Sequence, residues 1–314
     1  MSDQEYIVGK CRQCSEELRV PARLESFSCM YCGARLTPED LITEEPPEKS
    51  IQDADLVMER VKKRIIHCIL DHPGINQRIT RREYDPSFEE YTRACRPVFD
   101  DLNQICRQEP SRQTERIEEA AASFLDQLEQ YWSQQKGWNN KMKRAQILDN
   151  DKLTVAVYLV PMVDYLDLAI SKEFCQTLQK MWVERYPKSP FYLGTYEDIA
   201  AGFRKKFKFC FITTAVCEEL GKPDDCEELT AFRAFRDGYL AACADGPALI
   251  EEYYDIAPGI VTCINLCGDR GERYAAIRSQ YLEPCYEDLR SGRLEACKRR
   301  YTQMVRDLQK QYLS

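Results

Sequence analysis

The stretch LTVAVYLVPMVDYLDL, residues 153–168, is apolar on almost every side and contains only two charged residues, Asp164 and Asp167. A helix that is apolar all round is buried inside a larger structure. We therefore expect this segment to form a central helix, bent at Pro161. Such a helix needs other helices around it, so this stretch favours a mainly α fold.

Three segments on the N-terminal side of this stretch carry apolar residues at helical spacing. Their apolar positions are Leu56, Val57, Val61, Ile65, Cys68 and Ile69 in the first segment, Phe88, Tyr91, Cys95, Phe99, Leu102 and Cys106 in the second, and Ile117, Ala121, Phe124, Leu128 and Tyr131 in the third. Pro97 is expected to kink or divide the second helix. Each stripe needs a partner helix, which predicts an antiparallel helical bundle.

The C-terminal side of the central stretch also has helical periodicity. An amphipathic segment covers residues 171–186, and further helices are expected near residues 211–220, 226–243, 246–256, 270–289 and 293–312. Ser291-Gly292 is typical of a tight turn between two helices. The predicted fold class is thus mainly α, an antiparallel helical bundle with a small β zinc ribbon at the N-terminus.

The zinc ribbon is predicted from four cysteines in two Cys-x-x-Cys pairs, Cys11/Cys14 and Cys29/Cys32. Two such pairs brought face to face supply the four thiolates that hold Zn²⁺ tetrahedrally. Short alternating segments at residues 17–20 and 34–36 predict small strands beside the pairs, and Gly33 suits a positive φ after the second. Four thiolates leave no open position on the metal, so we expect the Zn²⁺ to be structural.

Composition and charge narrow the class of protein. The chain has 314 residues, a net charge of −8 and a pI of about 5.2, which argues against general attraction to nucleic acid or anionic lipid. We find no signal-peptide pattern and no run of about 18 apolar residues. We therefore expect a soluble cytoplasmic protein, with no membrane partner and with an oligomeric state that the sequence leaves open.

The sequence predicts four parts: a zinc ribbon at residues 1–40, an acidic linker at 41–50, a helical domain at 51–204 and a second helical domain at 205–314. The linker is predicted because the acidic, proline-bearing stretch before Ser50 has no periodic apolar face. Twelve of the sixteen cysteines lie outside the ribbon, without another Cys-x-x-Cys. We favour packing for them, against a redox, reactive or second metal site among them.

Three blocks of the last part carry a family resemblance. They are FCFITTAVC at residues 209–217, LTAFRAFRD at 229–237 and YYDIAP at 253–258. In this order they resemble the bacterial CFI-box C-terminal domain, over roughly residues 205–314. The chain departs from the common pattern at residues 216–219, where the family usually has an aromatic residue and a glycine. The resemblance implies no catalytic activity and favours a docking or assembly unit.

Cys210 is the candidate for chemistry in this domain. It follows the cationic stretch Arg204-Lys205-Lys206-Phe207-Lys208, and nearby cations lower the pKa of a thiol. The competing interpretation, which we favour, is that Cys210 is a small core residue. Neither of the two histidines, His67 and His72, stands in a recognisable Cys/His arrangement in the sequence, and His72 is expected to complement a helix dipole.

Arg233, Arg236 and Asp237 are close in sequence, and the two arginines share a helix face. They suit either an anion clamp or a partly buried ion-pair network with acidic groups of a neighbouring helix, and we favour the network. The acidic residues 218–228 around Gly221 lack the spacing of a calcium loop, which favours a solvated loop.

The leading functional hypothesis is a cytoplasmic adaptor or interaction protein that contains a structural zinc ribbon. Residues 1–40 carry five basic and seven acidic residues, a net charge of −2, so we expect the ribbon to bind protein rather than nucleic acid. One alternative is an enzyme with Cys210-dependent thiol chemistry near Arg233 and Arg236. A weaker one is a ribbon associated with nucleic acid. Whether the protein is an enzyme stays open, with a non-enzyme favoured.

Overall fold

The structure is a computed structural model that describes residues 6–13, 16–21, 24, 26–42, 53–204 and 210–314. Backbone contacts divide the chain into two compact units, Met1–Ala54 and Asp55–Ser314. Each unit has its own core. Of the predicted linker at residues 41–50, Leu41–Ile42 forms a strand of the first unit and residues 43–50 lie outside the described residues.

The N-terminal unit is a small β structure. Its strands are β1 (Tyr6–Cys11), β2 (Glu17–Pro21), β3 (Phe27–Ser28), β4 (Arg35–Leu36) and β5 (Leu41–Ile42), with a short 3₁₀ turn at Pro38–Asp40. One antiparallel sheet has the order β2-β1-β5, and β3 pairs with β4. Its core consists of Cys11, Leu18, Val20, Cys29, Leu36 and Leu41. Two of its buried residues are thus cysteines.

The helical unit contains the α-helices of the described part of the chain. They are α1 (Ala54–Ile65), α2 (His67–Leu70), α3 (Tyr84–Gln108), α4 (Gln113–Ser133), α5 (Lys141–Thr154), α6 (Val160–Tyr165), α7 (Ser171–Arg185), α8 (Tyr196–Arg204), α9 (Phe211–Glu219), α10 (Glu227–Phe235), α11 (Gly246–Asn265), α12 (Arg270–Ile277), α13 (Glu283–Arg290) and α14 (Leu294–Tyr312). Short 3₁₀ turns lie at Ile75–Arg78 and Pro110–Arg112. The prediction of a mainly α fold is confirmed.

The stretch at residues 153–168 is central, as predicted, but it is not one regular helix. Every residue from 151 to 163 is buried. Helix α5 ends at Thr154, a π-helical turn covers Val155–Leu159, and α6 begins at Val160. Pro161 stands in the first turn of α6, where its missing N–H is tolerated. The local change in winding therefore precedes the proline.

The structure corrects two details of the predicted helices. Pro97, expected to kink or divide its helix, does not divide it, because α3 runs unbroken from Tyr84 to Gln108. Pro97 and Arg93 are both exposed, so water can satisfy the carbonyl group of Arg93 that the proline cannot bind. Leu56, assigned to the buried stripe of the first helix, is 70% exposed, whereas Val57 is buried.

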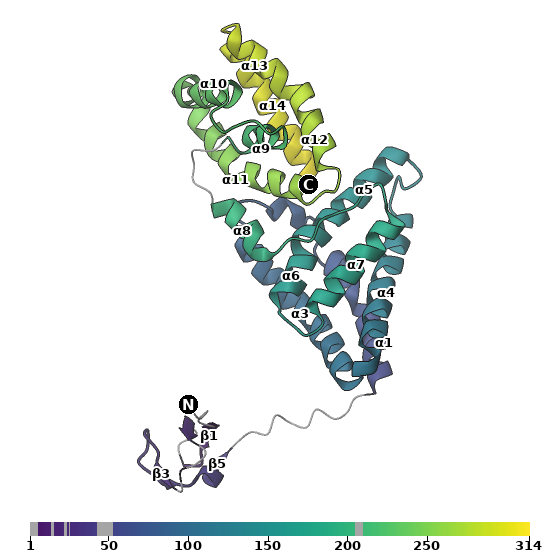
Figure 1. The fold of residues 1–314 in the computed structure, drawn as a ribbon, viewed down its shortest axis with the longest axis vertical. Helices are drawn as coiled ribbons and strands as arrows, with labels where there is room; N and C mark the ends of the chain where they lie inside the picture. The colour runs from purple at the N-terminus through teal and green to yellow at the C-terminus, as the bar shows by residue number, and fades with distance from the viewer. Residues whose placement is uncertain (1–5, 14–15, 22–23, 25, 43–52, 205–209) are drawn as a thin grey trace. The chain divides into compact units, whose positions relative to one another are not determined.

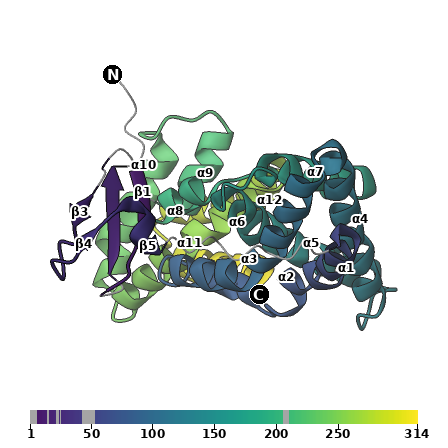
Figure 2. The same ribbon diagram turned by 90° about the horizontal axis from the view of Figure 1, so that it is seen from below.

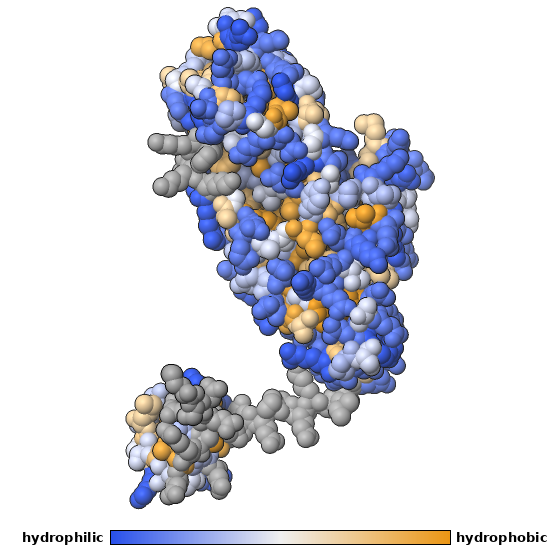
Figure 3. All heavy atoms as spheres, in the orientation of Figure 1, coloured by the Kyte–Doolittle hydropathy of each residue, from blue (hydrophilic) through white to orange (hydrophobic). Residues whose placement is uncertain are grey.

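Several pairs of helices pack against each other within the helical unit. Helices α4 and α7 lie side by side in both ribbon views (Figures 1 and 2). Near the C-terminus, α14 packs against α13 and α11, and α11 also contacts α9 and α8. Hydrophilic side chains cover most of the face of this unit seen in Figure 3. Among the described residues, no helix combines the length and the apolar character needed to cross a membrane.

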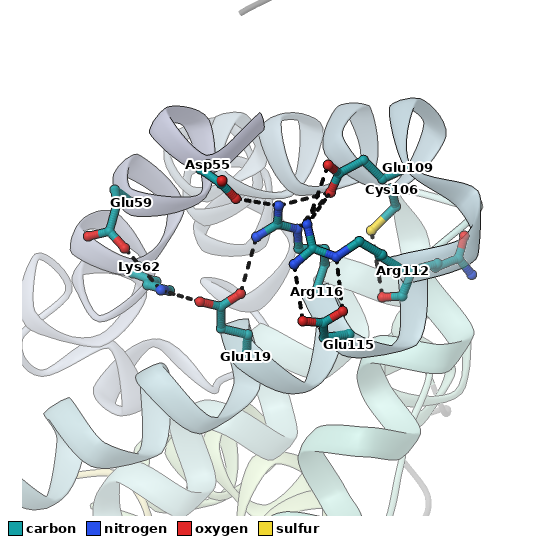
Figure 4. A network of polar contacts seen from close by, with 10 residues as sticks. Asp55, Glu59, Lys62, Cys106, Glu109, Arg112, Glu115, Arg116 and Glu119 are labelled. Atoms are coloured by element: carbon teal, nitrogen blue, oxygen red, sulfur yellow. Dashed lines mark hydrogen bonds and ion pairs between the residues drawn. The ribbon is translucent and has the colours of Figure 1, made fainter. Parts of the chain in front are cut away.

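A buried arginine joins the first helix of this unit to the following ones (Figure 4). The Arg116 side chain, on α4, is only 4% exposed. It pairs with Asp55 at 2.5 Å, with Glu109 at 2.9 Å and with Glu119 at 3.4 Å. A guanidinium with several carboxylate partners keeps its charge compensated away from water. The network fixes the N-terminal end of α1 against α4.

Candidate metal centre

Three cysteines of the N-terminal unit converge on one point. The Sγ atoms of Cys11, Cys29 and Cys32 lie within 4.8 Å of one another. The sulfur atoms of Cys11 and Cys32 are 3.7 Å apart. Cys11 and Cys29 are buried, and Cys32 is exposed. Cys14, the fourth predicted ligand, lies outside the described residues.

Backbone hydrogen bonds set the two cysteine turns. After β1, the N–H of Cys11 donates to the carbonyl of Glu16 at 2.9 Å, which closes the first turn. After β3, the N–H of Cys29 donates to Ala34 at 2.8 Å, and that of Gly33 donates to Cys29 at 2.9 Å. Gly33 has a φ of +75°, a left-handed conformation that glycine adopts without strain. The positive φ predicted for Gly33 is confirmed.

The spacing of the sulfur atoms suits a metal ion. Thiolates bound tetrahedrally to Zn²⁺ at about 2.3 Å lie about 3.8 Å apart, close to the 3.7 Å between Cys11 and Cys32. The backbone N–H of Gln13 points at the sulfur of Cys11, at 3.4 Å. Such a contact stabilises a thiolate, the form that binds metal. This group of three cysteines, two of them buried, can therefore hold a metal ion.

Cys210 lies at the other candidate site, in the helical unit. It directly precedes α9 and is 4% exposed. Burial raises the pKa of its thiol, against the opposing charges of Arg236 and Arg233. The cations at residues 205–208 that suggested an activated thiol lie outside the described residues. With its pKa raised, Cys210 is a poor nucleophile near neutral pH.

A cavity of about 60 Å³ borders Cys210. Its lining is mainly apolar and includes Phe232, Phe235 and Leu249, with Arg236, Glu252 and Arg306 among the polar residues. The volume is well below the roughly 150 Å³ that holds a benzene molecule. The cavity therefore has room for only a few atoms beside the thiol.

The two predicted arginines are paired within their own segment. Arg233 binds the carboxylate of Asp224 at 2.6 Å, and Arg236 binds that of Asp237 at 2.6 Å. Arg236 also donates to the hydroxyl of Tyr254 at 2.9 Å. The sequence predicted carboxylate partners from a neighbouring helix. Instead, the partner of Arg233 comes from the loop before α10, and the partner of Arg236 is the residue that follows it. Local pairing, which costs less chain ordering, satisfies both charges.

A Cys/His pair that the sequence did not reveal lies in the first half of the helical unit. Nε2 of His72 is 3.5 Å from Sγ of Cys95, and Cys68 lies beside them. Hydrogen bonds from Cys68 and His72 lower the pKa of Cys95 to about 6, although burial opposes this shift. The sequence shows no recognisable Cys/His arrangement, but the structure places His72 beside Cys95. His72 and Cys95 come from different segments, 23 positions apart, and only folding brings them together.

The other residues weighed from the sequence have structural partners. Nδ1 of His67 lies 2.9 Å from the carboxylate of Asp71 on the protein surface. In the acidic loop, Glu219 pairs with Arg270 at 3.4 Å. Comparison of the chain with protein-family models, curated proteins and solved structures found no match. The chemistry of the protein must therefore be argued from its own geometry.

Proposed function

We propose that Cys11, Cys14, Cys29 and Cys32 hold a structural Zn²⁺ ion, and that the protein is a cytoplasmic adaptor that uses this ribbon to bind another protein. The observation that carries the proposal is the convergence of Cys11, Cys29 and Cys32 from two separate turns. Cys14 follows Cys11 at the spacing that supplies a fourth thiolate. The filled coordination shell leaves the metal a structural role.

The second cysteine turn supports a protein partner. Met30 and Tyr31 lie between Cys29 and Cys32, and they are 79% and 60% exposed. A flexible thioether and an amphipathic ring side by side are side chains that protein interfaces favour. The zinc would hold this turn rigid, so that binding need not order it. In this proposal the helical body, which resembles the CFI-box domain, is an assembly unit, and the ribbon recruits the partner protein to it.

The two alternative functions have less support. For an enzyme that uses Cys210, burial and the raised pKa of the thiol argue against a ready nucleophile. For a nucleic-acid ribbon, the net charge of −2 over residues 1–40 provides little attraction to phosphates. Protein binding through the exposed turn remains the function that the geometry supports best.

Metal analysis of the full-length protein tests the zinc ribbon. We expect Cys29→Ser to lose one equivalent of zinc relative to the wild type, because three thiolates hold the ion far more weakly than four. Cys243→Ser is the matched control, since Cys243 lies outside both cysteine turns and is partly exposed. Equal zinc content in Cys29→Ser and the wild type would contradict the proposal.

A double substitution tests the adaptor role. Met30→Ser combined with Tyr31→Ser removes the exposed side chains and leaves all four cysteines in place, so zinc content should not change. Proteins captured from the native host by the wild type should be lost with this variant, and the interaction should be reproduced with the purified partner. Binding of nucleic acid that weakens steeply with salt, with no lost protein, would favour the nucleic-acid alternative.

A further inference from the structure

A second group of metal-binding side chains lies where α9 meets α10. The Sγ atoms of Cys217 and Cys226 are 3.9 Å apart, and Sγ of Cys217 is also 3.9 Å from a carboxylate oxygen of Glu228. All three donor atoms lie within 4.8 Å of one another. Cys217 is buried, while Cys226 and Glu228 are partly exposed. Two thiols and a carboxylate thus meet near the surface.

The loop between the helices holds these groups in place. Cys217 lies in the last turn of α9, and the N–H of Lys222 donates to its carbonyl at 2.9 Å. Gly221, with a φ of +67°, allows the chain to reverse here. Cys226 then stands at the N-terminal cap of α10, and Glu228 is the second residue of that helix. The ligands are therefore fixed by two helix ends and a tight turn.

The distances suit a tetrahedral ion. Two thiolates on Zn²⁺ lie about 3.8 Å apart, and a thiolate and a carboxylate oxygen about 3.6 Å apart. The observed 3.9 Å separations need only a small contraction. A cavity of about 20 Å³ borders both Cys217 and Glu228. This is enough room for one water molecule as a fourth ligand.

We propose that Cys217, Cys226 and Glu228 form a second metal site, which binds a thiophilic divalent cation such as Zn²⁺ and leaves one coordination position for water. Two thiolates favour Zn²⁺ over Mg²⁺ or Ca²⁺, which prefer oxygen ligands. An open position would distinguish this site from the closed ribbon site, because the bound water can be replaced or activated.

Lys222 acts as an internal competitor of the metal. Its ammonium lies 2.6 Å from the carboxylate of Glu228 and compensates its charge. Metal binding to Glu228 must separate this carboxylate from Lys222. Removing the lysine charge should therefore strengthen metal binding.

Cobalt titration of the full-length protein tests the site separately from the ribbon. The background variant carries Cys11→Ser, Cys29→Ser and Cys32→Ser, so that the ribbon cannot contribute. We expect it to bind one equivalent of Co²⁺ with sulfur-to-cobalt charge-transfer absorption. Adding Cys226→Ser should abolish this absorption, and adding Glu228→Gln should weaken binding because it removes a charged ligand. Lys222→Met should strengthen it.

Two control substitutions test whether the effects are specific to the three proposed ligands. Cys243→Ser and Glu227→Gln replace a partly exposed thiol and an exposed neighbouring carboxylate that are not in the cluster, and neither should change the titration. Circular dichroism should show the same helix content in all variants, because Cys226 is partly exposed. The proposal is overturned if the ribbon-free background gives no charge-transfer band, if Cys226→Ser leaves the band intact, or if Cys217 and Cys226 prove to be joined by a disulfide. None of these outcomes affects the ribbon proposal.

Discussion

At the residue scale, the environment of each thiol decides its reactivity. Cys210 lies beside the guanidinium of Arg236, with 3.6 Å between Nη1 and Sγ, yet burial raises the pKa of its thiol. Cys95 is just as buried, but Cys68 and His72 lower its pKa. A nearby cation thus does not suffice to activate a cysteine. The hydrogen bonds that stabilise the thiolate must also outweigh the cost of burial.

The raised pKa of Cys210 predicts slow alkylation. In the native protein near neutral pH, iodoacetamide should modify Cys210 at least roughly tenfold more slowly than the partly exposed Cys243, because the reacting thiolate is scarce and covered. Mass spectrometry of peptides after timed labelling gives both rates. Rapid stoichiometric labelling of Cys210 would instead revive the enzymatic alternative. Denaturation should remove the difference between the two cysteines.

A buried charge network predicts a large stability effect at Asp149. Its carboxylate, on α5, accepts hydrogen bonds from the Arg273 guanidinium at 3.0 and 3.1 Å and from the fully buried Lys152 at 2.5 Å. Asp149→Asn leaves these cations without their shared anion, which we expect to reduce the free energy of unfolding by about 3 kcal/mol. Denaturant unfolding measures the change. Glu251→Gln, in an exposed ion pair, should stay within about 0.5 kcal/mol of the wild type.

The stabilisation by the Asp149 carboxylate should decrease as the pH falls. Burial raises the pKa of Asp149, but Lys152 and Arg273 outweigh it, so the pKa is below its usual value. At acidic pH the unfolded chain therefore takes up this proton before the native protein does. The stabilisation is complete above about pH 4 and is lost as pH falls through the native pKa. A difference between wild type and Asp149→Asn that grows on acidification would contradict this assignment.

The sequence predicted only those site residues that lie close together in the chain. The Cys11/Cys14 and Cys29/Cys32 pairs have a spacing that itself specifies metal binding, and three of these cysteines converge in the structure. His72 and Cys95 have no such spacing, since they meet only through the packing of two segments. The Cys217/Cys226 pair spans a loop, and nothing in its spacing distinguishes it from packing cysteines.

At the element scale, close backbone approach makes one glycine of α11 indispensable. A Cβ atom added at Gly259 would lie 1.8 Å from the carbonyl oxygen of Ile79. Gly259→Ala must therefore push α11 away from the segment before α3, and we expect a loss of at least about 2 kcal/mol in unfolding free energy. Gly202→Ala, on α8, meets only an ordinary contact at 3.7 Å and should be neutral or stabilising. Thermal unfolding of both variants makes the comparison.

Periodicity predicted where the helices lie better than how they are wound. The helices at residues 113–133 and 171–185 follow from apolar spacing alone. The π-helical turns at Val155–Leu159, Arg236–Leu240 and Arg278–Leu282 were not predicted. Each adds one residue to a turn, and only tertiary packing decides where that extra residue is accommodated. The strand β1 was also missed, because its residues form no apolar alternation of the predicted kind.

At the scale of the whole molecule, the division into two units separates two sources of stability. The helical unit buries a large apolar core, with tryptophans such as Trp132 and Trp182 fully covered. Among the described residues of the N-terminal unit, by contrast, the core cluster contains six buried residues, two of them cysteines. So small a core rarely folds alone, and a metal ion usually supplies the missing free energy. The two units should therefore respond differently to loss of metal.

Cys29→Ser in the full-length protein tests this difference. If the proposed Zn²⁺ site is correct, loss of the ion removes on the order of 10 kcal/mol from the N-terminal unit, so residues 6–42 should unfold and become sensitive to protease. The melting of the helical unit, followed by far-ultraviolet circular dichroism, should not change, because Cys29 belongs to the other compact unit, Met1–Ala54. A lower melting temperature of the helices would mean that the ribbon stabilises the body directly. The ribbon would then fold together with the helical body. An adaptor whose ribbon is a separate folding unit should instead show independent melting of the two units.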